Sequence, residues 1–321
     1  MTPDFIAPLS HGIFAIDTGF VRPHFDVAYL MVDAGRAAFI DTGLNSSVPN
    51  LLAALDWLGL ARDAVDWVIP THVHLDHAGG AGLLMQQLPH ATLLAHPRGA
   101  PHLIDPGALV AGASAVYGAD EVARIYGQIQ PIASERVQTS SDGQRIRLGE
   151  RELLLIDSPG HARHHHCIWD GASRGWFTGD TFGISYPECD APGGRYIFPT
   201  STPVQFEPEA LHRSVQRMLE QAPVWMYPTH CGRIGGSEAE VKRLAALLLE
   251  QADTMAAGAR ELIAAPERHA ALKRSVEALF SDRWHWLDPG RKQAEIAELI
   301  AIDVELNAQG LGVWLDRGAR G

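Results

Sequence analysis

The chain has little cysteine, no long apolar run and no excess of positive charge, and each deficit excludes a class of protein. Its 321 residues include three cysteines, Cys167, Cys189 and Cys231. So low and odd a count does not suggest a disulfide framework and fits a reducing compartment. No window approaches the ~18 apolar residues of a membrane span. The N-terminus shows no basic segment followed by an apolar one, so no signal peptide is predicted. We expect a soluble, cytoplasmic protein with no membrane partner.

The balance of charge is acidic. The formal net charge of −12 argues against nucleic acid as the main ligand, because phosphate binding requires a basic face. Apolar residues make up 46% of the chain, which is enough for a substantial core. These features favour a folded protein whose main ligand is not nucleic acid, although a local basic groove could still exist.

Short apolar runs alternate with turn signals over the first 230 or so residues. They predict strands at 28–32, 37–43, 67–72, 92–96, 153–161, 176–180 and 224–230. Helical spacing of leucines predicts a helix within 46–60, and a glycine pair opens a second one at 79–88. Mixed strands and helices of this kind predict an α/β sandwich.

The pattern becomes helical near Ser237. Ser237 and Glu240 form a capping-box pattern at the start of a helix over 237–263. A further helical pattern covers 290–310 and is predicted to end at Gly310. We therefore expect a catalytic domain over 1–236 and a helical C-terminal extension over 237–321 that packs on it.

Metal-ligand residues follow four of the predicted strands. "THVHLDHAGG" carries His72, His74, Asp76 and His77, and the other strands lead to His161, Asp180 and His230. A lone histidine after a strand is usually only hydrogen-bonded or solvated. Several ligand-type residues at the ends of successive strands instead predict a metal centre at one edge of the fold.

The seven residues divide into two ligand sets. His72, His74 and His161 make a three-imidazole set that leaves a position open for water. Asp76, His77 and His230 make a second set. Asp180 is the natural bridge between two ions ~3.5–4 Å apart. All the ligand atoms are nitrogen or oxygen, which suits Zn²⁺ and also admits Fe or Mn.

The order of these motifs resembles the metallo-β-lactamase superfamily. HxHxDH at 72–77, PGH at 159–161, GD at 179–180 and PTHCG at 228–232 stand in the family's order, from about Ile13 to Gly232. The resemblance implies an αβ/βα sandwich with a dinuclear site at one edge. It also implies that Asp41 supports the metal ligands from behind and that His165 is a structural support.

Differences between this sequence and other branches of the family indicate which branch it resembles most. The zinc β-lactamases usually carry cysteine where Asp180 stands, and the flavodiiron reductases carry glutamate where His74 stands. Nucleic-acid-processing members generally carry extra clamp elements. The chain therefore resembles most the branch with glyoxalase II-type thioesterases and lactonases.

The predicted function is a dinuclear metal-dependent hydrolase. We expect a hydroxide that bridges the two metals to attack the carbonyl carbon of a small ester, lactone or thioester. Asp76 is expected to ligate one metal and to steer or accept the proton. Cys231, beside His230, is expected to be a buried small residue rather than a nucleophile.

Substrate contacts are less clearly marked. A loop with four aromatic residues follows Asp180 and is predicted to cover the mouth of the site. Tyr186 in this loop is a candidate hydrogen-bond donor to substrate, with packing as the alternative. Arg195 and Arg233 are candidates for binding a carboxylate. The C-terminal helices are expected to shape the pocket or to form a homodimer contact.

Three other functions stay open. One is a mononuclear iron enzyme like the persulfide dioxygenases, which the complete Asp76, His77 and His230 set disfavours. Another is a phosphodiesterase or nuclease, and the last is a binding module with structural metals. The sequence does not identify the substrate, the native metal or the oligomeric state.

Overall fold

The chain folds into two compact units. The computed structural model describes residues 1–201, 205–230 and 232–318, so Cys231 lies outside the described residues. The first unit comprises Met1–Asp157, His164–Gly179 and Thr229–Arg233. The second comprises Ser158–Arg163, Asp180–Pro228 and Ile234–Gly321. This division differs from the predicted boundary after residue 236, which stays a prediction.

A seven-stranded mixed sheet forms one layer of the first unit. Its strands run in chain order, with antiparallel pairs up to the fourth strand and parallel pairs beyond it. They are β1 (Ile6–Pro8), β2 (Ile13–Asp17), β3 (Val27–Asp33), β4 (Arg36–Ile40), β5 (Val65–Ile69), β6 (Thr92–Ala95) and β7 (Val137–Thr139). The parallel pairs place the carboxyl ends of β4 and β5 at the same edge of the sheet.

An antiparallel sheet forms the other layer of this unit. It contains, side by side, β11 (Gly175–Phe177), β10 (His166–Asp170), β9 (Arg151–Asp157) and β8 (Arg145–Leu148). The rings of Tyr29 in β3 and Phe177 in β11 meet edge to face with centroids 5.2 Å apart. The two sheets therefore contact each other through buried aromatic side chains.

His166 links the two layers of the first unit through hydrogen bonds. Burial lowers its pKa to about 4, so the imidazole is neutral at pH 7. Its Nε2 lies 2.8 Å from the Pro70 carbonyl oxygen, which can only accept, so this nitrogen donates. Its Nδ1 then accepts from the Ser140 hydroxyl at 2.8 Å. These two hydrogen bonds join the segments that follow β5 and β7 to β10.

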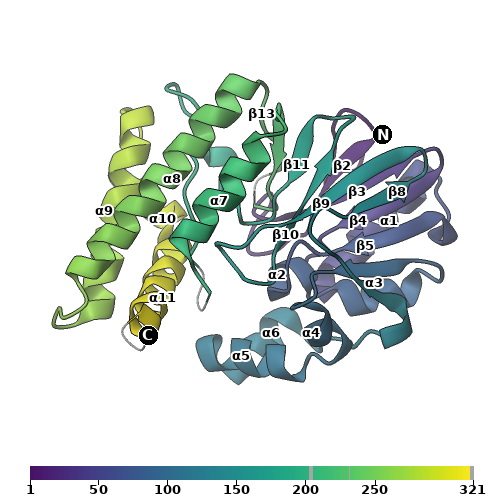
Figure 1. Ribbon diagram of the computed structural model, residues 1–321, viewed down its shortest axis with the longest axis horizontal. Coiled ribbons are helices and arrows are strands. Elements are labelled where there is room, and N and C mark those ends of the chain that lie inside the picture. Colours follow the sequence, from purple (N-terminus) through teal and green to yellow (C-terminus); the bar gives the residue numbers. More distant parts are fainter. Residues whose placement is uncertain (202–204, 231, 319–321) are drawn as a thin grey trace. The chain divides into compact units, whose positions relative to one another are not determined.

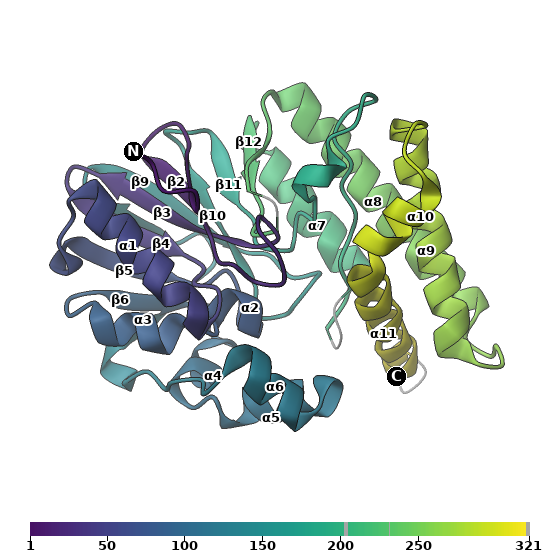
Figure 2. The ribbon, with the colours of Figure 1, turned by 180° about the vertical axis from the view of Figure 1, so that it is seen from behind.

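Helices cover the outer face of the mixed sheet (Figure 2). Leu51 and Leu55 of α1 and Leu84 of α3 are fully buried in an apolar cluster with Phe39 and Val68 of the sheet. This packing follows from the apolar face that the helical spacing predicts. The helices of this unit are α1 (Val48–Leu58), α2 (Leu75–Ala78), α3 (Ala81–Gln87), α4 (Ala100–Ile104), α5 (Gly107–Tyr117) and α6 (Ala119–Tyr126).

The second unit is built mainly from helices (Figure 1). Its elements are α7 (Pro208–Leu219), β12 (Trp225–Tyr227), β13 (Ile234–Gly235), α8 (Glu238–Glu261), α9 (Arg268–Leu287), α10 (Gln293–Leu299) and α11 (Ala301–Gly318). The four aromatic residues of the loop after Asp180 are fully buried, namely Phe182, Tyr186, Tyr196 and Phe198. Tyr196 stacks on Trp284 of α9 at 5.2 Å, and its hydroxyl donates to Gln251 of α8 at 2.7 Å.

None of the described helices combines the length and the apolar character needed to cross a membrane.

Most of the predicted elements are confirmed. Each predicted strand overlaps an observed one, namely β3, β4, β5, β6, β9, β11 and β12, and the helices predicted at 46–60 and 79–88 are α1 and α3. The Ser237 cap is confirmed, since the Glu240 amide donates to the Ser237 hydroxyl at 3.1 Å. The mixed α/β class is confirmed as well.

The predicted helix end at Gly310 is wrong. Gly310 lies inside α11, which continues to Gly318. A Cβ at Gly310 would lie 1.9 Å from the Ser201 carbonyl oxygen, so glycine allows the helix and the loop to touch. Asn307, one turn earlier, accepts from the Ser201 amide at 2.8 Å. The glycine therefore marks a close contact rather than a helix end.

Gly310→Ala should lower the free energy of unfolding by ~1–3 kcal/mol, because the new methyl group collides with the Ser201 backbone. Gly312→Ala is the matched control in the same helix. Its Cβ would meet its nearest atom, Leu272 Cδ1, at 3.9 Å, so we expect a gain of up to ~1 kcal/mol. Urea unfolding of both variants checks the prediction, and equal effects of the two substitutions would contradict the close contact.

Candidate metal centre

The motif at 72–77 occupies the turn and the short helix that follow β5. The strand ends at Ile69, directly before Pro70, which has no amide hydrogen to donate to a neighbouring strand. His74 is the N-terminal capping position of α2, and Asp76 and His77 lie within that helix. His72 Nε2 and His74 Nδ1 lie 2.8 Å apart, so the two nitrogens converge on one point.

Asp76, His77 and His230 form a compact group within the first unit. One ligand atom from each lies within 4.8 Å of the others. Asp76 Oδ2 is 3.7 Å from His77 Nε2 and 3.5 Å from His230 Nε2. The Val27 amide donates to the Thr229 carbonyl at 2.8 Å, which holds the segment of His230 beside β3. The structure thus brings the predicted second ligand set together.

The carboxylate of Asp41 accepts hydrogen bonds from several segments that carry this group. Asp41 is fully buried and directly follows β4, with a left-handed φ of 57°. Its Oδ1 accepts from the Thr71 amide at 2.6 Å. Its Oδ2 lies 2.6 Å from the Thr229 hydroxyl and 2.9 Å from His77 Nδ1. One side chain therefore connects the turn after β5, helix α2 and the segment of His230.

His161 and Asp180 lie together in the second unit. His161 follows β9 and Asp180 follows β11, and His161 Nε2 is 3.5 Å from Asp180 Oδ2. Both side chains are at least 95% buried, with exposed fractions of 0% and 5%. His161 Nδ1 lies 3.1 Å from the Thr200 carbonyl oxygen. A buried imidazole and carboxylate in this arrangement suit the coordination of a cation.

The hydrogen bonds of three histidines decide which of their nitrogens can ligate a metal. Nδ1 of His77 faces a carboxylate, and Nδ1 of His161 and of His230 face the carbonyl oxygens of Thr200 and Phe25, the last at 3.3 Å. These oxygens can only accept, so Nδ1 donates in each case. In a neutral imidazole the lone pair is then on Nε2, the nitrogen directed at the acidic partner. Metal-ligating histidines are usually held in this way, so the residues fit a divalent metal.

The remaining predicted residues have structural partners. The rings of His165 and His72 stack with centroids 4.8 Å apart, and both are buried. The Tyr186 hydroxyl donates to Asp303 of α11 at 3.0 Å, and the residue is fully buried. Arg195 pairs with Asp190 at 2.7 Å, and Arg233 donates to the Ser10 hydroxyl at 3.2 Å. The substrate roles of Tyr186, Arg195 and Arg233 stay predictions.

Sequence patterns did not identify several supporting groups. The threonines at 71 and 229 and the backbone carbonyls of Phe25 and Thr200 hold the candidate ligands. Both threonines directly precede histidines in the "PTH" repeats at 70–72 and 228–230, which is the one signal that points to them. The carbonyl groups leave no signal, since any residue type supplies one.

The candidate ligands divide between the two units. The first unit supplies His72, His74, Asp76, His77 and His230, and the second supplies His161 and Asp180.

Comparison with known proteins gives the same family as the motifs. The model of the metallo-beta-lactamase superfamily matches residues 21–230. The metallo-beta-lactamase fold-containing protein ST1585 of Sulfurisphaera tokodaii is 25% identical over 225 residues, which are 70% of this chain and 79% of that protein. Its crystal structure aligns with a TM-score of 0.63 over 94% of this chain and 99% of that one, at 22% identity. That likeness shows the fold.

Some of the relatives carry the names of enzymes. The hydroxyacylglutathione hydrolase of Salmonella typhi is 33% identical over 162 residues, which are 50% of this chain and 49% of that protein. The acyl-coenzyme A thioesterase MBLAC2 of Bos taurus is 29% identical over 193 residues, or 54% and 64% of the two chains. The chain thus spans about half to two thirds of these two enzymes.

The matched region covers the predicted motif order from HxHxDH to the final histidine, and the predicted αβ/βα sandwich with a helical C-terminal region is confirmed. This chain belongs to the metallo-beta-lactamase superfamily.

Proposed function

We propose that this protein is a dinuclear metal-dependent hydrolase that cleaves a small ester, lactone or thioester, with a thioester as the first choice. The observation that carries the proposal is the fixed orientation of His77, His161 and His230. Each has its Nδ1 hydrogen bonded to an oxygen that can only accept, which leaves Nε2 as the ligand atom.

The two ligand sets would hold one ion each. His72, His74 and His161 would hold one, Asp76, His77 and His230 the other, and Asp180 would serve both. Zn²⁺ is the proposed metal because all the donors are imidazole nitrogens and carboxylate oxygens. Bound there, such ions supply Lewis-acid polarisation of a carbonyl group and lower the pKa of a water to ~7.

The protein's own groups position this chemistry. Asp41 fixes the rotation of the His77 ring and the turn that carries His72, so the ligands are arranged before a metal or substrate arrives. Asp76 is the most exposed member of its group, at 23%, against 0% for His77 and 5% for His230. Its carboxylate can therefore both ligate a metal and accept a proton from the solvent side.

The names of two relatives support the thioester. They describe the hydrolysis of an acylglutathione and of an acyl-coenzyme A. No serine or cysteine nucleophile is required, because the attacking group would come from water.

A second acidic side chain, Asp26, lies near the Asp76 group. It is fully buried, and neither of its carboxylate oxygens has a hydrogen-bond partner among the described residues. Burial raises its pKa to about 8, although the nearby His230 and His77 oppose the rise. In the metal-free protein Asp26 therefore holds its proton at neutral pH, and a nearby metal cation would favour its release.

Replacing ligands tests the proposed centre. His161→Ala and Asp180→Ala should each lose at least one metal equivalent and lower kcat/KM on a thioester by at least ~100-fold, because each removes a direct ligand. His212→Ala is the control, since this histidine pairs with Asp253 on the surface of the same unit. Metal analysis and a panel of thioester, lactone and phosphodiester substrates give the answer, and circular dichroism checks the fold.

Full metal content in both ligand variants would refute the assignment. A single iron with thiol-dependent oxygen uptake and no hydrolysis would replace the hydrolase with an oxygenase. Turnover confined to the phosphodiester would replace it with a phosphodiesterase.

Asp26→Asn should stabilise the metal-free protein increasingly as the pH rises. The folded pKa of about 8 exceeds the unfolded value, so the folded state binds more protons between the two values and loses stability as the pH rises through this range. Asparagine keeps the shape without the ionisation. The difference in unfolding free energy between variant and wild type should grow by roughly 3 kcal/mol from pH 5 to pH 8. A difference that is constant with pH would show that Asp26 ionises normally.

A further inference from the structure

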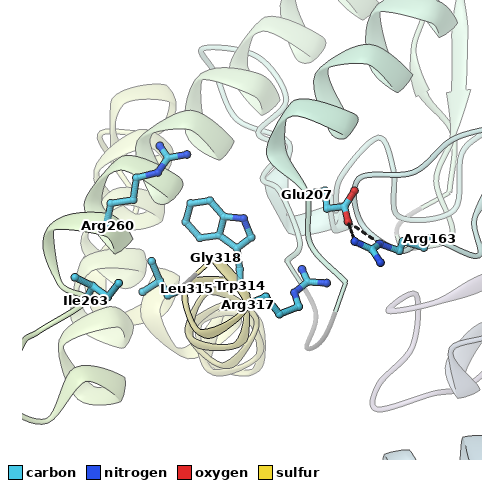
Figure 3. A pocket seen from close by; sticks show the side chains of 8 residues that line it. All are labelled: Arg163, Glu207, Arg260, Ile263, Trp314, Leu315, Arg317 and Gly318. Atoms are coloured by element: carbon cyan, nitrogen blue, oxygen red, sulfur yellow. Dashed lines mark hydrogen bonds and ion pairs between the residues drawn. The ribbon is translucent and has the colours of Figure 1, made fainter. Parts of the chain in front are cut away.

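A pocket of about 500 Å³ lies in the second unit, at the meeting of α8, α11 and the segment after His161 (Figure 3). Among the described residues, its lining includes three arginines, Arg163, Arg260 and Arg317, and one acidic residue, Glu207. The chain as a whole has a net charge of −12, so this concentration of positive charge is local. A volume of this size suits a ligand as large as a nucleotide.

Two of the arginines are incompletely neutralised. Arg163 is paired with Glu207, whose Oε1 accepts from its Nε at 2.6 Å. The Arg317 guanidinium donates to the Phe206 carbonyl at 2.8 Å, while its Nε is buried with no hydrogen-bond partner among the described residues. Arg260 lies 3.8 Å from Glu209, and both of those side chains are more than half exposed. Ion pairs exposed to this extent contribute little to stability.

The pKa of Arg317 also indicates an excess of positive charge in the pocket. Burial, together with the positive charge of Arg163, lowers the pKa of Arg317 below its usual value. A site that disfavours an additional positive charge favours an anion. Arginines also bind phosphate through paired, charge-assisted hydrogen bonds.

An aromatic surface stands between the arginines. Trp314 projects into the pocket, with Arg260 on one side and Arg163 and Arg317 on the other (Figure 3). The Arg260 guanidinium lies 4.9 Å from the centroid of its ring. Ile263, which is 47% exposed, adds an apolar wall. Such surfaces stack on the rings of nucleobases, so the lining suits a molecule with both a planar ring and phosphate groups.

The chain segment that carries His161 also supplies one residue of the pocket wall, Arg163. Arg163 follows His161 by two residues, so their Cα atoms are at most ~7 Å apart. The Glu207 amide donates to the Gly160 carbonyl at 2.8 Å, which ties the pocket wall to the residue before His161. The segment that carries His161 therefore continues directly into the wall of the pocket.

We propose that this pocket binds the nucleoside-diphosphate end of a coenzyme A-type thioester substrate. The proposal rests on the proposed hydrolase function and names the substrate class of that site. The arginines take the phosphate groups, Trp314 takes the ring, and the acyl end extends toward His161.

Binding of ADP to the metal-loaded protein, measured by titration calorimetry, tests the pocket without any need for turnover. We expect Arg260→Gln and Arg317→Gln each to weaken ADP binding by ~10-fold or more, because each removes a charged donor. Adenosine and inorganic phosphate should each bind much more weakly than ADP. Arg283→Gln is the control, since Arg283 is an exposed arginine of α9 that pairs with Glu250 outside the pocket.

Two further experiments distinguish binding in the pocket from binding at the metal centre. ADP should still bind to His161→Ala, which is expected to lose metal, because the pocket rather than the metals holds the phosphates. ADP should also compete with an acyl-coenzyme A and raise its KM without lowering kcat.

Absence of ADP binding, equal binding by the arginine variants, binding that disappears with the metal, or inhibition that is not competitive would each overturn the proposal. Failure to hydrolyse any ester, lactone or thioester would instead refute the proposed function, and ADP binding that depends on the arginines would remain measurable in that case.

Discussion

The hydrogen bonds that the Asp41 carboxylate accepts determine how the candidate ligands of the first unit are arranged. Four groups share its two oxygens: the Thr71 amide, the Thr71 and Thr229 hydroxyls, and Nδ1 of His77. These groups come from segments far apart in the chain, so one buried charge fixes their relative positions. A buried carboxylate is costly unless all its lone pairs are used. The left-handed backbone at Asp41 adds a cost of ~1–3 kcal/mol, which the surrounding hydrogen bonds must offset.

The positions of the ligands along the chain could be predicted because they follow from strand geometry. Apolar runs identify β5, β9, β11 and β12, and each ligand motif begins within four residues of a strand end. Motifs of this kind contain chemically distinctive side chains, so a single sequence is enough to find them. The supporting groups are different. Backbone carbonyls and threonine hydroxyls are common, and their role appears only when the fold brings them to a histidine.

In the helical part of the chain, local features could be predicted from the sequence and contacts between distant residues could not. The cap at Ser237 was predictable because it depends on residues three positions apart. Gly310 was misinterpreted because its neighbour, Ser201, is more than a hundred residues away in the chain. The same holds for Tyr186, whose buried hydroxyl bonds with Asp303. An aromatic residue in a loop with proline and glycine looks like part of a site mouth until the helices that enclose it are known.

The hydrogen bonds between Asn307 and Ser201 bear on how this protein could have evolved. Asn307 of α11 holds the Ser201 backbone, and the preceding residue, Thr200, offers its carbonyl to His161. The orientation of a candidate ligand thus depends on a helix near the end of the chain. Exchange of the C-terminal helices between related proteins would therefore also change the support of His161. A lineage that acquired new helices for a new substrate would have to keep this one contact or rebuild the support of His161 at the same time.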